Sequence, residues 1–91
     1  MSEPVRRRVV VHGTVQGVFF RDSTRREAVS AGVSGWVCNR PDGTVEAVFE
    51  GDPDAVASMV EWAQQGPRGA AVERVEESEE PAEGLTGFEV R

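Results

Sequence analysis

The chain has 91 residues, enough for a single domain spanning residues 1–91 and too few for a second hydrophobic core. Its net charge of −6 disfavours nucleic acid as a partner. No apolar run approaches the length of a membrane-spanning helix or of the apolar region of a signal peptide, so we expect a cytoplasmic protein that binds no membrane. One cysteine, Cys38, excludes an internal disulfide, and with one histidine, His12, it supplies too few ligands for a zinc site.

Residues 5–12 alternate as a strand does, with Val5, Val9 and Val11 on one face. This strand leads into the glycine loop, residues 13–21, which reads Gly-Thr-Val-Gln-Gly-Val-Phe-Phe-Arg. Its two glycines allow a tight turn, and inward-pointing amide N–H groups that open onto a helix N-terminus are typical of an anion site. Arg21, next to that terminus, can bind phosphate oxygens through two N–H groups at once. The simpler interpretation is an ordinary strand-to-helix loop with a surface arginine.

A helix is expected over residues 22–31, with Asp22 and Ser23 as capping residues and Gly32 just after its end. Its expected inner stripe consists of Phe20, Thr24, Ala28 and Ala31. Residues 33–39 and 44–50 predict two strands joined by the turn Arg40-Pro41-Asp42-Gly43. On the solvent side of the sheet, the strand at residues 44–50 carries Glu46 and Glu50. We expect these carboxylates to face Arg6 and Arg8 of the strand at residues 5–12.

Asp52 and Pro53 predict the start of a second helix. Its buried stripe is Val56, Met59, Val60 and Ala63, and Gly66-Pro67 ends it. A weak strand over 71–76 is followed by an acidic run, residues 76–83, which we interpret as a solvated loop, and then by a short edge strand containing Phe88 and Val90. The order β-α-β-β-α-β predicts an α+β, ferredoxin-like sandwich. Its antiparallel sheet carries both helices on one face, with the first two strands parallel and the third between them.

A second stretch, residues 35–45, reads Gly-Trp-Val-Cys-Asn-Arg-Pro-Asp-Gly-Thr-Val. Asn39 is most simply a residue that opens the turn. The predicted topology can nevertheless bring it beside the glycine loop. There its amide could hold a water molecule in line with a bound phosphoryl group.

Together the two stretches resemble the motifs of the acylphosphatase family, and the resemblance extends along nearly the whole chain. Residues 13–21 match the family's Gly-x-Val-Gln-Gly-Val-x-Phe-Arg run, and residues 35–45 match Gly-aromatic-Val-x-Asn-x-x-x-Gly-x-Val. The resemblance implies hydrolysis of acyl phosphates to a carboxylate and inorganic phosphate without metal or cofactor. It also implies that Arg21 binds the phosphate and that Asn39 positions the attacking water. The phosphate cradle would then consist of the backbone amides of Val15, Gln16, Gly17, Val18 and Phe19. The chain departs from many relatives at Cys38 and in lacking a C-terminal aromatic residue.

No strong general base lies near these motifs, so we expect an oxygen of the substrate's own phosphate to accept the proton of the attacking water, without His12 or Cys38. The alternative is a binding module that holds a phosphate-bearing ligand without turnover. An RNA-binding domain is disfavoured because the chain is acidic and its strands lack paired aromatic residues. A monomer is expected in the absence of an exposed apolar stripe.

Overall fold

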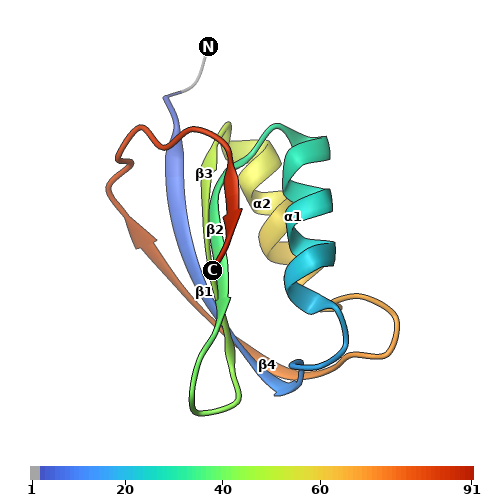
Figure 1. The fold of residues 1–91 in the computed structure, drawn as a ribbon. Helices are drawn as coiled ribbons and strands as arrows, with labels where there is room; N and C mark the ends of the chain where they lie inside the picture. The colour runs from blue at the N-terminus through green and yellow to red at the C-terminus, as the bar shows by residue number, and fades with distance from the viewer. Residues whose placement is uncertain (1–2) are drawn as a thin grey trace.

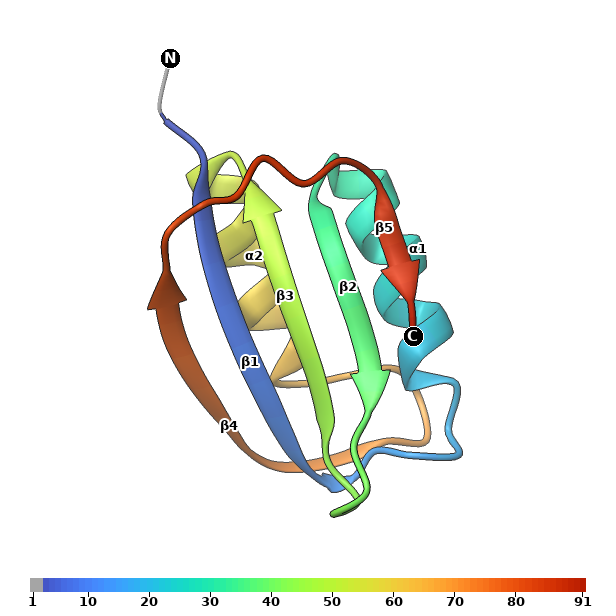
Figure 2. The ribbon, with the colours of Figure 1, turned by 60° about the vertical axis from the view of Figure 1, so that its left-hand side comes forward.

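The computed structural model describes residues 3–91; residues 1–2, part of the predicted single domain, lie outside the described residues. The helices and strands in chain order are β1 (Val5–Thr14), α1 (Phe20–Ala31), β2 (Ser34–Asn39), β3 (Val45–Gly51), α2 (Pro53–Ala63), β4 (Ala71–Glu80) and β5 (Phe88–Val90). The five strands form one sheet in the order β4-β1-β3-β2-β5, which Figure 2 shows from its open face.

The predicted topology is confirmed. Strand β3 lies between β1 and β2 and is antiparallel to both, so β1 and β2 run parallel to each other. Strand β4 pairs antiparallel with β1 at one edge, whereas β5 pairs parallel with β2 at the other. The sheet is therefore mixed at the β5 edge, and the fold is the expected ferredoxin-like α+β sandwich.

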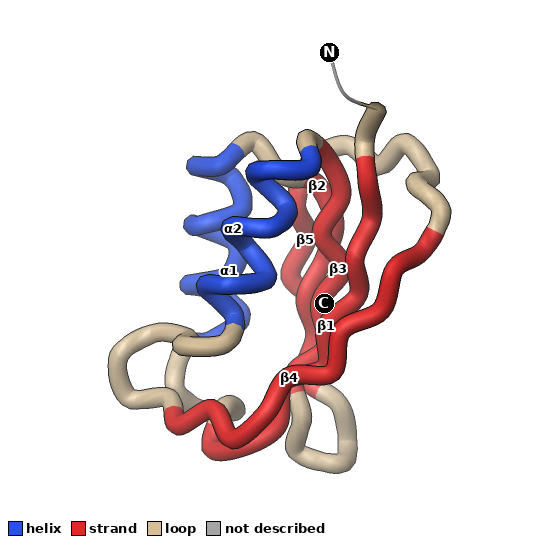
Figure 3. The backbone as a smooth tube through the Cα atoms, turned by 180° about the vertical axis from the view of Figure 1, so that it is seen from behind, coloured by secondary structure: helices blue, strands red, loops and turns tan. Residues whose placement is uncertain are grey.

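Both helices cover the same face of the sheet, as Figures 1 and 3 show from opposite sides. The core lies between these two layers and includes the whole predicted stripe of α2: Val56, Met59, Val60 and Ala63. From α1, Phe20, Thr24 and Ala28 are buried as expected. Ala31 was wrongly assigned to this stripe, because it is exposed. The left-handed Gly32 turns the chain there and places Val33 in the core instead.

The start of α2 follows the sequence signal, but the start of α1 does not. The Asp52 carboxylate accepts hydrogen bonds from the N–H groups of residues 54 and 55, at 3.2 and 3.4 Å, as an N-cap residue does. Helix α1 begins two residues earlier than expected, so Asp22 and Ser23 lie within its first turn and Phe19 occupies the cap position without a side-chain hydrogen bond. Burial of Phe20 against Trp62, with the ring centroids 5.6 Å apart, accounts for the earlier start.

The acidic run, residues 76–83, was predicted to be a loop, but this is right only from residue 81 onward, since residues 76–80 belong to β4. Strand β4 extends into the run as far as Glu80, because it pairs with a part of β1 whose three consecutive arginines form ion pairs with its carboxylates. Glu80 accepts from the Nε atoms of Arg6 and Arg8 at 2.8 and 2.7 Å, and Arg7 contacts Glu77 at 2.7 Å. Hydrogen bonds from Arg8 and then Arg6 lower the pKa of Glu80 to about 2. Cross-strand ion pairs thus stabilise a strand whose own sequence favours a loop.

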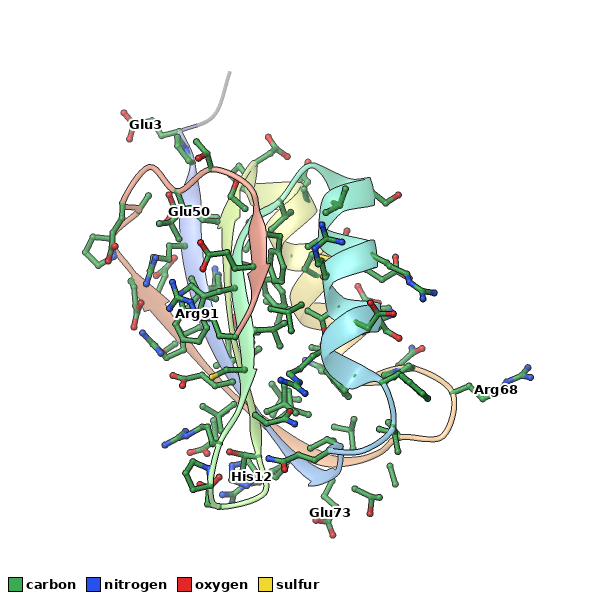
Figure 4. The ribbon with its side chains drawn as sticks, viewed as in Figure 1. Glu3, His12, Glu50, Arg68, Glu73 and Arg91 are labelled. Carbon is green, nitrogen blue, oxygen red and sulfur yellow. The ribbon has the colours of Figure 1, made fainter. Side chains whose placement is uncertain are left out.

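The open face carries the expected pairs of opposite charge, but one of them is buried. Arg6 and Glu50 are only 5% and 3% exposed, with Nη1 and Oε2 3.3 Å apart. Figure 4 shows Glu50 where the β4–β5 connection passes over the sheet. The N–H groups of residues 83–85 all donate to its carboxylate. Burial alone would raise the pKa of Glu50, but these donors outweigh burial, and the pKa is lowered. Glu50 therefore fixes the connection that leads to β5.

Candidate active site

The glycine loop and the end of β2 meet in one cavity of about 300 Å³. Its lining includes the two predicted catalytic side chains and three of the five predicted cradle residues: Arg21, Asn39, Val15, Gly17 and Phe19. Of the other two cradle residues, Gln16 faces the neighbouring hairpin and Val18 packs against the core. The fold thus brings together Arg21 and Asn39 from two different elements.

The path of the glycine loop is fixed at both ends. Strand β1 shifts register between His12 and Gly13, and a Cβ atom at Gly13 would lie 2.1 Å from the carbonyl oxygen of Ala71. Only glycine fits such a close approach of two backbones. Val15 and Phe20, 1% and 3% exposed, anchor the two sides of the turn in the core. The loop therefore has little freedom before it enters α1.

The Gln16 side chain joins the glycine loop to the β2–β3 hairpin. Its Nε2 donates to the carbonyl oxygens of Arg40 and Thr44, at 2.8 and 2.9 Å. These two residues close the hairpin turn, since the Arg40 N–H donates to the Thr44 carbonyl oxygen at 2.9 Å. Asn39 directly precedes the turn, so Gln16 fixes the distance between the loop and Asn39. The family resemblance implies only a backbone role for Gln16.

Asn39 is the last residue of β2, and this position places it in the lining of the cavity. Its Oδ1 atom is buried and has no hydrogen-bond partner within residues 3–91. Burial of an amide oxygen without a donor is unfavourable, which makes this atom a ready acceptor for a donor that enters the cavity. Asn39 shares the helix-covered face of the strand with Val37, whose side chain is in the core.

His12 and Cys38 lie on the opposite face of the sheet from Asn39. The Cys38 thiol lies 3.9 Å from a carboxylate oxygen of Glu46, and burial, then the charge of Glu46, raises the pKa of that thiol. His12 Nε2 lies 2.5 Å from Glu76, at the end of the sheet shown in Figure 4. Neither side chain lines the cavity.

Arg21 contacts the last segment of the chain. Its Nη1 donates to the backbone oxygen of Arg91 at 3.0 Å, and the Arg91 N–H donates to the carbonyl oxygen of Val37 at 2.8 Å. The guanidinium of Arg91, which is labelled in Figure 4, lies over the Trp36 ring on the open face, 4.7 Å from the ring centroid. Val90 also lines the cavity. No local sequence signal pointed to Val90 or Arg91, because their place depends on the pairing of β5 with β2.

The charges of the cavity suit an anion despite the acidic chain. Arg21 supplies a cation, and the first turn of α1 begins at the cavity with N–H groups that the helix itself does not satisfy. Asp22 also lines the cavity, but its carboxylate is paired with Arg26 at 2.7 Å. A small oxyanion can therefore be bound by N–H groups from both side chain and backbone.

The family model for acylphosphatase matches residues 7–90. The chain belongs to the acylphosphatase family. An acylphosphatase of Rubrobacter xylanophilus is 64% identical over 85 residues, covering 92% of this chain and 77% of the relative. One from a Synechococcus strain is 55% identical over 91 residues, covering 100% of this chain and 97% of the relative. The solved structure of an acylphosphatase from Coxiella burnetii superposes with a TM-score of 0.93 at 41% identity, covering 97% of this chain and 93% of that one.

These comparisons confirm the family resemblance that the two motifs indicate. Within residues 3–91, no helix has the length and apolar character needed to cross a bilayer. The same residues hold no cluster of three or more His, Cys, Asp or Glu side chains suited to a metal ion.

Proposed function

We propose that this acylphosphatase binds the phosphoryl group of its substrate between Arg21 and the backbone amides of residues 15–19, while Asn39 positions the attacking water. Membership of the family makes the chain a hydrolase that splits acyl phosphates into a carboxylate and inorganic phosphate. The observation that carries the assignment of roles is that Arg21 and Asn39 line one cavity together with the glycine loop.

The phosphoryl group needs mainly charge stabilisation and orientation. A charge-assisted hydrogen bond from Arg21 contributes about 1.5–3 kcal/mol, and a helix N-terminus adds up to about 2 kcal/mol in a partly buried site. One N–H of Arg21 donates to the backbone oxygen of Arg91, and the remaining donors of the guanidinium can bind the phosphate. The contact with Arg91 holds the guanidinium at the cavity before the substrate arrives.

Asn39 would orient the water through its Oδ1 atom, which would accept one of the water's two hydrogens. The water oxygen then forms a bond to phosphorus as the bond from phosphorus to the carboxylate oxygen breaks. The second proton of the water passes to a phosphoryl oxygen of the substrate. Because the leaving group is a stable carboxylate, no general acid is required, and neither His12 nor Cys38 takes part.

The test is release of inorganic phosphate from an aryl acyl phosphate, with EDTA present, by the wild type and by single variants. Arg21→Gln and Asn39→Ala should each lower kcat/KM at least 100-fold, while His12→Ala and Cys38→Ala should keep it within about threefold. A steep loss in either of the last two variants would contradict the proposed proton route. If the wild type bound phosphate without turnover, the cavity would be an anion-binding site instead.

We also propose that the enzyme acts as a monomer in the cytoplasm. The single cysteine suits a reducing compartment, and the net charge of −6 disfavours association with anionic surfaces. Light scattering coupled to size-exclusion chromatography tests the oligomeric state, and a dimer mass at micromolar concentration would contradict it.

A further inference from the structure

Hydrophobic side chains exposed to solvent gather at the candidate active site. Within residues 3–91, the large hydrophobic side chains that remain exposed are Phe19, Val29 and Val90, at 81%, 57% and 44%. Phe19 and Val90 both line the cavity that contains Arg21. Since both are exposed as well, they lie at its rim. An apolar surface of this kind beside a polar site is typical of a ligand-binding position.

The backbone of Phe19 adds an independent observation. Its φ of 60° makes it the one non-glycine residue in the left-handed region within residues 3–91. Bulky side chains are rare there, and such strain concentrates at functional sites. The residue also occupies the N-cap position of α1, where glycine or a small polar residue would be more stable, and its side chain makes no cap hydrogen bond. Neither folding nor capping therefore explains an aromatic ring at this position.

The position of the ring relative to the phosphate site suggests a role for it. With the phosphoryl group bound by Arg21 and the loop amides, as in the proposed function on which this inference rests, the rest of the substrate must extend past the rim. We propose that the acyl group of the substrate lies against the Phe19 ring and Val90, and that Phe19 is a specificity-determining residue. It favours acyl phosphates that carry an apolar ring or chain over those with a two-carbon acyl group.

The experiment compares two substrates that share the phosphate but differ in the acyl group, benzoyl phosphate and acetyl phosphate. The selectivity is the ratio of their kcat/KM values. In Phe19→Ala this ratio should fall about tenfold from that of the wild type, chiefly through a higher KM for benzoyl phosphate. Phe19→Leu should retain most of the ratio, because it keeps an apolar side chain. Val29→Ala, which truncates an exposed apolar side chain on α1 that does not line the cavity, should leave the ratio unchanged.

A second variant separates recognition from backbone effects. Phe19→Asn tolerates the left-handed backbone but removes the apolar ring, so its selectivity should fall as it does in Phe19→Ala. A purely conformational role would lower both kcat/KM values alike and weaken inhibition by inorganic phosphate. A ratio within twofold of the wild type in both variants would overturn the proposal. Failure of the proposed function would look different, since Arg21→Gln would then keep its activity whatever the selectivity.

Discussion

Gln16 offers a sharp test of how the site is assembled. Replacement by methionine preserves the length of the side chain but removes both hydrogen bonds to the hairpin, at 2.8 and 2.9 Å. Each such bond contributes about 0.5–1.5 kcal/mol, so the free energy of unfolding should fall by about 1–3 kcal/mol. Release of the hairpin also lets Asn39 move relative to the loop. A displacement of about 1 Å in a reacting arrangement can cost about 100-fold in rate.

Urea unfolding gives the change in stability, and kcat with a saturating aryl acyl phosphate gives the change in turnover. Gln65→Met is the matched control, because Gln65 is exposed beyond the end of α2 and should change neither quantity. We expect kcat of Gln16→Met to fall by about 10- to 100-fold, which corresponds to a displacement of Asn39 by about 0.5–1 Å. A variant within 0.5 kcal/mol and twofold of the wild type would refute the argument that Gln16 positions Asn39.

Two further predictions concern the charged side chains of the open face. Glu50→Gln should lower the free energy of unfolding by about 3 kcal/mol, because it leaves the buried Arg6 guanidinium without this charged partner. A urea unfolding midpoint equal to that of the wild type would contradict a stabilising role of the buried pair. Glu80 has a folded-state pKa of about 2 against a reference value of 4.5, so the stability it contributes is complete above about pH 4.5 and is lost as the pH falls to about 2. Thermal unfolding from pH 6 to pH 2 should therefore show a shallower loss of Tm in Glu80→Gln than in the wild type, whereas parallel curves would exclude this residue as a source of the acid sensitivity.

Sequence patterns gave most of the fold because local signals agreed with tertiary packing. The stripe of α2, the Asp52 cap and the hairpin turn each depend on residues within one element or its flank, and each is confirmed. The glycine loop and Asn39 belong to two separate motifs. Their spacing in the two motifs indicated one site, and the topology places both at one cavity.

Features that depend on distant partners could not be predicted in this way. Residues 76–80 of the acidic run form a strand by pairing with β1, whose three arginines lie more than 60 positions away in the sequence. The contact of Arg21 with Arg91 spans 70 positions and requires the parallel pairing of β5 with β2. The hydrogen bonds of the Gln16 side chain depend on where the hairpin ends. In each case the decisive group is remote in sequence, where propensity and periodicity carry no information.

The central claim is that Arg21 binds the phosphate and Asn39 positions the water. The most direct measurement is the pair of values, kcat for an aryl acyl phosphate and the inhibition constant of inorganic phosphate, for wild type, Arg21→Gln and Asn39→Ala. We expect Arg21→Gln to raise the inhibition constant at least tenfold and also to lower kcat, whereas Asn39→Ala should lower kcat and leave phosphate binding nearly unchanged. Equal losses of phosphate binding in both variants, or full turnover in either one, would contradict this division of roles.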